Sequence, residues 1–367
     1  MPTFCLSLHL HQPARLKHYT FFDIGESAVY ENTDGTRDFM NTDARGITLP
    51  TLRLLLRQIT EYQGDYRVAL SLSGLFMEYC DLYAPEVMDT LKALADTGSV
   101  EFLNGTYYHS LASLISAQEF REQIILHSSA IQTCLGQVPT AFANSGLIAS
   151  DDIAREVENL GYQVMLAAHT GMPSPGHVYQ PASCALMKLL LVQSLPLKNP
   201  AAILGGHTRG EVVALSRDLP GIGHALGEDP VFMDFLEMLP GTALSQKNAV
   251  FKTPTQVARE HPQAKNLSPA AFLSGVPPIG NLSPWLGNDM QKDALDTLYH
   301  IENEVKSLRD PALLRTWRIL QDADHFLAMG APAVGEGFKL PLGSFYDAYI
   351  NYMNILTDFT ERIGSRE

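Results

Sequence analysis

Two histidines near the N-terminus, His9 and His11, are the first side chains that could do chemistry. They stand one residue apart at the end of an apolar run over residues 4–10 that has the pattern of a β-strand, so both belong to one face. A His-x-His pair can open a metal site, but the conceivable further ligands, His109 and His169, do not make a complete set. We therefore expect no metal and no cofactor, and we interpret the pair as contacts to a substrate.

A second cluster of polar and aromatic side chains follows the strand-like segment that starts at Val100. It contains Tyr107, Tyr108 and His109, and sugar sites combine aromatic faces with a few fixed polar groups in this way. Trp285 offers a further aromatic face much later in the chain. The sequence leaves open whether each of these rings contacts sugar or packs in the core.

Alternating strand-like and helix-like segments must position these side chains. Strands are predicted near residues 4–10, 67–73, 100–104, 139–143 and 163–167, and helices near 50–63, 85–97, 117–135 and 151–161. This alternation predicts an α/β fold of parallel strands with crossover helices. In barrels of this kind the active site lies at the carboxyl ends of the strands, where the two clusters are expected.

The C-terminal third of the chain has a different pattern. A link rich in proline and serine at 262–284 precedes three amphipathic segments, about 285–309, 311–330 and 344–363, which predict a C-terminal helical bundle. We therefore predict two domains, residues 1–255 and 256–367.

Several ordered segments resemble the motifs of glycoside hydrolase family 57, in its α-amylase-like branch. The segments are His11-Gln12-Pro13, Tyr107 to Leu114, Asn144 to Ile148, Leu282 to Gln291 and Asp324-His325-Phe326. The resemblance implies an incomplete parallel (β/α)7 barrel with a C-terminal α-helical bundle, and an α-glucan or maltooligosaccharide as partner. On the same basis, substrate binding is assigned to His9, His11, Tyr108, His109, Trp285, Asp324 and His325.

This sequence differs from that family at the positions of the catalytic carboxylates. The family's nucleophile is a glutamate within Asn-Thr-Glu-Leu-Ile, and the aligned residue here is Gly146. Ile222 stands at the position of the general acid/base aspartate, and two further acidic positions hold Gly105 and Asn281. A retaining glycosidase needs two carboxyl groups about 5–5.5 Å apart. The resemblance therefore implies an α-glucan-binding protein that is catalytically impaired, a pseudoenzyme.

Two other functions stay open at this stage. An active α-amylase or 4-α-glucanotransferase would need substitute carboxylates, and the candidates are Glu101, Asp151, Asp152 and Glu228. A metal-dependent hydrolase would instead be built around the His-x-His pair. Sugar release from a maltooligosaccharide would favour the first function, and bound metal the second.

Composition limits the partners of the chain. Its 367 residues carry a formal net charge of −14, which disfavours nucleic acid and anionic membranes because both would repel it. We find neither the pattern of a signal peptide nor an apolar run of about 18–20 residues, and we expect a cytoplasmic protein without a membrane span. The four cysteines are scattered, which favours reduced thiols. The sequence does not indicate the oligomeric state.

Overall fold

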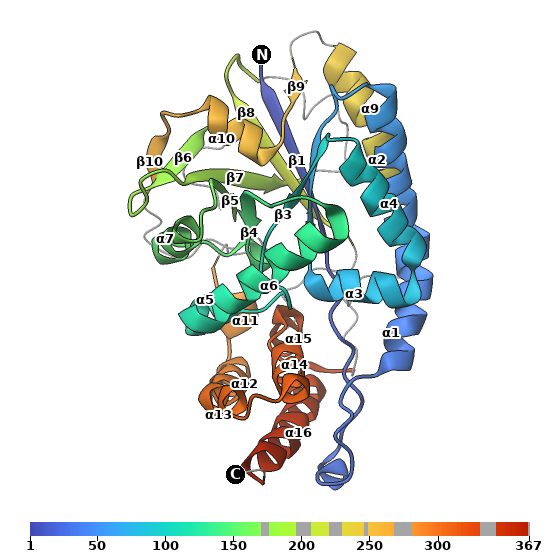
Figure 1. Cartoon of the computed structure of the whole chain (residues 1–367), viewed down its shortest axis with the longest axis vertical. Helices are drawn as coiled ribbons and strands as arrows, with labels where there is room; N and C mark the ends of the chain where they lie inside the picture. Colours follow the sequence, from blue (N-terminus) through green and yellow to red (C-terminus); the bar gives the residue numbers. More distant parts are fainter. Residues whose placement is uncertain are drawn as a thin grey trace.

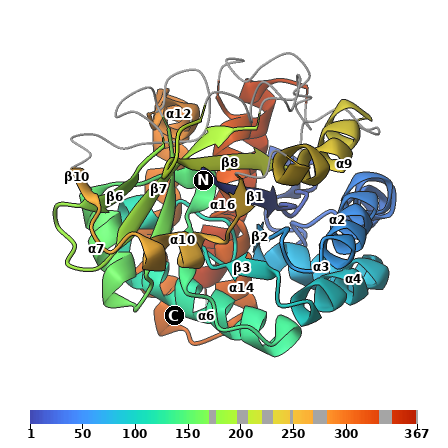
Figure 2. The ribbon, with the colours of Figure 1, turned by 90° about the horizontal axis from the view of Figure 1, so that it is seen from above.

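A nearly closed ring of parallel strands forms the centre of the protein and is seen from above in Figure 2. The computed structural model describes residues 1–169, 176–195, 207–219, 230–245, 249–267, 281–330 and 343–365. The strands around the ring are β1 (Thr3–Leu10), β2 (Val68–Leu72), β3 (Val100–Leu103), β4 (Ala141–Ala143), β5 (Val164–Ala168), β7 (Lys188–Ser194) and β8 (Val212–Asp218). A bridge between Asn104 and Phe142 joins β3 to β4, and β8 pairs with β1. The predicted incomplete (β/α)7 barrel is therefore confirmed.

The strands are apolar runs in the sequence because both faces of the sheet are buried. Every residue of β1 except His9 is buried, as expected for a parallel strand covered by helices. Five of the seven ring strands lie within three residues of the predicted ranges, whereas β7 and β8 were not predicted. A small antiparallel strand, β6 (Val178–Pro181), pairs with β7 and interrupts the regular alternation there.

Helices pack around the ring and follow the strands in the order expected of crossover connections. They are α1 (Thr33–Phe39), α2 (Leu49–Glu61), α3 (Gly74–Tyr83), α4 (Pro85–Asp96), α5 (Ala112–Ile115), α6 (Ala117–Leu135), α7 (Asp151–Asn159), α9 (Pro230–Ser245) and α10 (Pro254–Glu260), with 3-10 turns η1 (Phe21–Asp23) and η3 (Ser145–Leu147) and a π-helical segment η2 (Met40–Thr48). None of the described helices is long and apolar enough to span a membrane. Ser73, Ser116 and Ser150 each cap the helix that follows.

Two short strands after α9 remain part of the barrel. β9 (Val250–Phe251) pairs with β1, and β10 (Lys265–Leu267) pairs with β6. The described chain therefore stays with the barrel as far as residue 267, twelve residues beyond the predicted domain boundary at 255, which stays a prediction.

The C-terminal helices lie against the carboxyl ends of the barrel strands (Figure 1). They are α11 (Ser283–Leu286), α12 (Asp289–His300), α13 (Glu302–Ser307), α14 (Pro311–Ile319), α15 (Ala323–Ala328) and α16 (Phe345–Gly364). The first two predicted segments are each divided, because Asn288 and Asp322 cap new helices within them. The predicted helical bundle is confirmed, with shorter helices than expected.

A buried ion network joins this bundle to the barrel. Glu119 of α6 is fully buried and accepts hydrogen bonds from Arg318 Nε at 2.8 Å and Gln123 Nε2 at 2.9 Å. Lys306 Nζ lies 2.9 Å from the same carboxylate, and Glu122 adds a second acidic partner for both cations. Because the cations come from α13 and α14, the network holds the bundle at one position on the barrel.

The chain between β1 and α1 extends along α16, at the lower end of the molecule in Figure 1. The Tyr19 amide donates to Asn351 Oδ1 at 2.6 Å, and the Tyr30 hydroxyl donates to Asp358 Oδ2 at 2.6 Å. The Gly25 amide donates to the other oxygen of Asp358. These contacts join the segment that follows the first strand of the barrel to the last described helix.

Candidate functional site

His11 stands just after the end of β1, and two side chains hold its ring. Its Nδ1 is 2.7 Å from the hydroxyl of Ser73, and its Nε2 is 3.0 Å and 3.2 Å from the two carboxylate oxygens of Asp322. Ser73 follows β2 and caps α3, whereas Asp322 stands at the start of α15. The side chain of His11 keeps 13% of its surface exposed, so the ring can still contact a ligand.

His109 lies over His11, with the ring centroids 4.0 Å apart. Its Nδ1 is 3.7 Å from Asp322 Oδ1, which is too long for a hydrogen bond, and this buried nitrogen has no hydrogen-bond partner. The backbone of His109 is left-handed, with φ at 52°, and its carbonyl accepts the amide of Ala323. A non-glycine residue in this region is uncommon, and such strain concentrates at functional sites.

Two aspartates give the site a strong electrostatic asymmetry. Burial opposes ionisation of Asp322, yet His11 and His109 outweigh it and lower the pKa of this carboxyl well below its usual range. Burial and the negative charge of Asp322 raise the pKa of Asp324. Burial lowers the pKa of His109, but the carboxylates of Asp322 and Asp324 exceed that effect and raise it overall. Burial lowers the pKa of His9.

Gly146 lies in η3 at the end of β4, directly against the ring of Trp285. Its φ of 56° is left-handed, and a Cβ built there would overlap the Trp285 indole. Trp285 is only 2% exposed, as part of the core between the barrel and the bundle. The structure therefore places the predicted sugar platform in the core, where its ring fills the space into which a side chain at position 146 would project.

Of the other acidic positions of the family, the structure describes those held by Gly105 and Asn281. A Cβ on Gly105 would lie 2.7 Å from the carbonyl oxygen of Ala143, because the chain after β3 runs against the end of β4. Asn281 is exposed, and its side chain accepts the amide of Ser283. Ile222 lies outside the described residues.

The remaining residues assigned to substrate binding are placed at different depths. Tyr108 is buried, and its amide donates to Gln123. His325 is buried against the ring of Tyr352, and Asp324 is partly exposed. His9 is partly buried on β1, beside Asp218 of β8. The structure thus brings together His11, His109 and Asp324 but places Tyr108, His325 and Trp285 among core side chains.

Of the candidate substitute carboxylates, the structure describes Glu101, Asp151 and Asp152. Glu101 accepts the amide of Thr255 at the start of α10, so it caps a helix near the amino end of the barrel. Asp152 is exposed and pairs with Arg155. Asp151 occupies the first turn of α7, where its carbonyl accepts the hydroxyl of Ser183. Glu228 lies outside the described residues.

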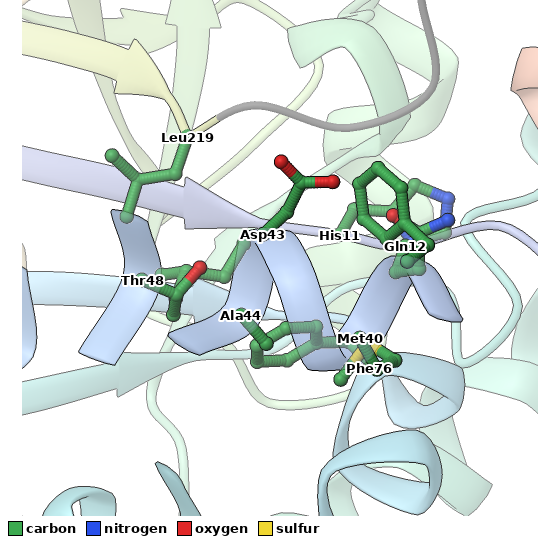
Figure 3. Close-up of a pocket in the computed structure, with 10 residues that line it drawn as sticks. His11, Gln12, Met40, Asp43, Ala44, Thr48, Phe76 and Leu219 are labelled. Atoms are coloured by element: carbon green, nitrogen blue, oxygen red, sulfur yellow. The ribbon is translucent and has the colours of Figure 1, made fainter. Parts of the chain in front are cut away.

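A small pocket opens beside His11 (Figure 3). Its volume is about 10 Å³, which holds roughly one water and is far below the few hundred Å³ of a ligand pocket. It is lined by Leu10, His11, Gln12, Phe39, Met40, Asp43, Ala44, Thr48, Phe76 and Leu219. Burial raises the pKa of Asp43, which projects from η2 beside the chain that carries His11 and Gln12. This pocket cannot admit a sugar ring.

Asp322 and Ser73 are the site residues that the sequence analysis missed. Asp322 stands two residues before Asp324, and aspartate is a residue type that favours helix starts. In the structure its side chain accepts the amide of Asp324. Ser73 is the last residue of a predicted strand, and polar residues of barrel active sites lie at the carboxyl ends of the strands. Neither signal identifies His11 as the partner.

The comparisons with known proteins agree with this geometry. The model of Glycosyl hydrolase family 57 matches residues 5–201. The protein named "Putative alpha-amylase" from Methanocaldococcus jannaschii is 27% identical over 395 residues, covering 96% of this chain and 83% of that protein. The chain belongs to glycosyl hydrolase family 57.

Solved structures show the same fold at low sequence identity. The 4-alpha-glucanotransferase from Thermococcus litoralis superimposes with a TM-score of 0.69 at 12% identity, covering 96% of this chain. The chain spans 59% of that protein's length. The GH57-type branching enzyme from Pyrococcus horikoshii gives a TM-score of 0.66 at 11% identity, covering 97% of this chain and 88% of that one.

A buried histidine beneath the site predicts a pH dependence of stability. His127 of α6 accepts the amide of Gly105 at 3.0 Å, and burial lowers the pKa of His127 to about 4. An unfolded histidine titrates near 6.5, so between about pH 6.5 and 4 the unfolded chain binds more protons and stability falls as the pH falls. We expect this residue to account for a loss of about 3 kcal/mol across that window.

The measurement is the free energy of unfolding in urea at pH 7 and pH 4. The variant His127→Gln keeps a hydrogen-bond acceptor but does not titrate, so its stability should fall less than that of the wild type over the same pH change. Equal losses in the two proteins would contradict the prediction.

Proposed function

We propose that this protein binds an α-glucan or maltooligosaccharide in the cleft of a family 57 barrel and that its capacity for hydrolysis and transfer is lost. The observation that carries the proposal is the contact between Gly146 and Trp285. The position aligned with the nucleophile has no carboxylate, and the indole occupies the space where one would extend. The covalent route of a retaining glycosidase disappears with its nucleophile.

The second glycine at an acidic position strengthens the proposal. At Gly105 the missing side chain would collide with the Ala143 carbonyl, so a carboxylate there would require the backbone to move. Two of the candidates for a substitute acid are engaged elsewhere: Glu101 caps α10, and Asp152 forms a surface ion pair. General acid–base catalysis alone contributes about 10²–10⁴-fold, so loss of both carboxylates should leave little activity.

Sugar binding is supported by the groups that remain accessible at the carboxyl ends of the strands. His11 and His109 keep 13% and 26% of their side chains exposed, and Asp324 is partly exposed beside them. An imidazole and a carboxyl group are suitable hydrogen-bond partners for sugar hydroxyls. With Trp285 and Tyr108 in the core, few aromatic faces are left among the described residues at this site, and we expect weak binding.

Calorimetric titration with linear maltooligosaccharides tests the binding, and reducing-sugar release from maltoheptaose tests the chemistry. We expect a millimolar dissociation constant, at least tenfold weakening in His11→Ala, and no detectable release of sugar. The matched control is His300→Ala, which removes an exposed histidine of α12 and should bind like the wild type.

Two outcomes would overturn the proposal. A folded protein that binds no maltooligosaccharide at millimolar concentration would have no glucan role. Robust turnover by the wild type would instead show an active enzyme with a substitute carboxylate, and Asp151→Asn and Glu228→Gln would then separate the two remaining candidates.

A further inference from the structure

We propose that His11, His109 and Asp322 form a binding site for a divalent transition metal, with Zn²⁺ as its best-suited ion. The cluster offers two imidazole nitrogens and one carboxylate oxygen, all within 4.8 Å of one another. Two nitrogens and one oxygen from protein, with a fourth position open, are a common ligand set of catalytic zinc sites. The site goes beyond sugar binding because it would exist whether or not a glucan is bound.

The distances between the ligand atoms suit a small ion. His11 Nε2 lies 3.0 Å and 3.2 Å from the two oxygens of Asp322, and His109 Nδ1 lies 3.7 Å from the nearer one. Zinc bonds of about 2.0–2.2 Å at tetrahedral angles place neighbouring ligand atoms about 3.3 Å apart. Shifts of a few tenths of an ångström would therefore bring the three atoms to coordinating distance.

The unpaired nitrogen of His109 is an independent observation that points to a ligand. Its Nδ1 is buried, lacks a hydrogen-bond partner, and faces the carboxylate of Asp322. The residue keeps a left-handed backbone to hold the ring there, and the amide of Ala323 donates to its carbonyl. A metal ion between the nitrogen and the carboxylate would satisfy both groups.

Outer contacts hold the other two ligands in place, as is usual around metals. The Ser73 hydroxyl is hydrogen-bonded to His11 Nδ1. A hydroxyl oxygen can accept a hydrogen bond from a protonated Nδ1, and in that tautomer Nε2 carries a lone pair that can coordinate a metal. The backbone amide of Asp324 donates to Asp322 Oδ1 at 3.0 Å. Asp322 itself has no exposed surface, which fixes the direction of its carboxylate.

This ligand set differs from the one that the His-x-His pair would form. His9 belongs to β1 and lies beside Asp218 of β8, outside the cluster. The third ligand, Asp322, comes from the C-terminal bundle, so the ion would connect the bundle to two barrel strands. Imidazole and carboxylate together suit zinc and other borderline ions more than Ca²⁺ or Mg²⁺, which prefer oxygen alone.

The test uses the full chain, stripped with a chelator and titrated with Zn²⁺ by calorimetry, with the bound metal counted by elemental analysis. We expect one Zn²⁺ per chain. His109→Asn removes the imidazole while keeping a residue type that tolerates positive φ, and Asp322→Asn removes the charge with little change in shape. Each should weaken Zn²⁺ binding at least tenfold.

Two matched histidine variants serve as controls. His9→Asn removes the neighbouring imidazole and His300→Asn an exposed one, and both should bind Zn²⁺ like the wild type. The absorption spectrum of bound Co²⁺ gives a second measurement on the unaltered chain, since a four-coordinate site gives far stronger visible bands than hydrated Co²⁺.

Three results would overturn the proposal. They are the absence of stoichiometric Zn²⁺ in the wild type, unchanged binding in a folded His109→Asn or Asp322→Asn, and a loss in His9→Asn equal to that in His109→Asn. Maltooligosaccharide binding to the stripped protein is measured separately, so failure of the metal site does not affect the test of the glucan cleft.

Discussion

Replacing Gly146 by glutamate is expected to lower the free energy of unfolding by about 2–6 kcal/mol and to produce no hydrolysis. The left-handed backbone costs a non-glycine residue about 1–3 kcal/mol, and overpacking against the Trp285 ring costs about as much again. Urea unfolding measures the stability, and sugar release from maltoheptaose measures the activity. A stable variant with activity would mean that the indole moves aside and that the inferred loss of the acid/base partner at Ile222 is wrong.

A matched control separates backbone strain from the collision. Gly98 has a φ of 65°, and a Cβ there would meet nothing within 4 Å, so Gly98→Glu should show only the conformational part of the loss. Gly146→Ala, in contrast, should already lose most of the stability that the collision with Trp285 costs, because its Cβ is the atom that overlaps the ring. Combining Gly146→Ala with Trp285→Leu tests the contact itself, because the double variant should lose less stability than the sum of the two single losses.

Removing the buried carboxylate of Glu119 is expected to destabilise the protein by about 3 kcal/mol. In Glu119→Ala, the charges of Arg318 and Lys306 would stay buried without their central partner, and breaking such a pair costs about 3–5 kcal/mol. The lower end applies here because Glu122 and Glu302 still contact the two cations. Urea unfolding again provides the measurement.

The control for this prediction lies on the same helix. Arg121 of α6, half of whose side chain is exposed, forms an ion pair with Glu156 at the surface, and Arg121→Ala should cost less than about 1 kcal/mol. If both variants lose the same stability, the Glu119 network does not hold the bundle to the barrel.

The sequence predicted most of the barrel correctly because local patterns determine its elements. Buried parallel strands are short apolar runs, and crossover helices carry periodic apolar faces with serine caps at their starts. β7 and β8 were missed, in a region where β6 interrupts the regular alternation and where part of the chain lies outside the described residues. The division of the C-terminal segments at Asn288 and Asp322 was also missed, although both residues are good helix caps.

The sequence by itself determined the family, the barrel, and the histidines at the ends of two strands. Only the tertiary structure decided what those histidines meet: Asp322 contacts His11 across 311 residues of sequence, from a bundle that the Glu119 network holds in place. It also decided that the ring of Trp285 lies on Gly146 in the core instead of in the cleft. Residue type and periodicity define the strand or helix to which a side chain belongs. Its distant neighbours depend on how whole elements pack, which no local pattern records.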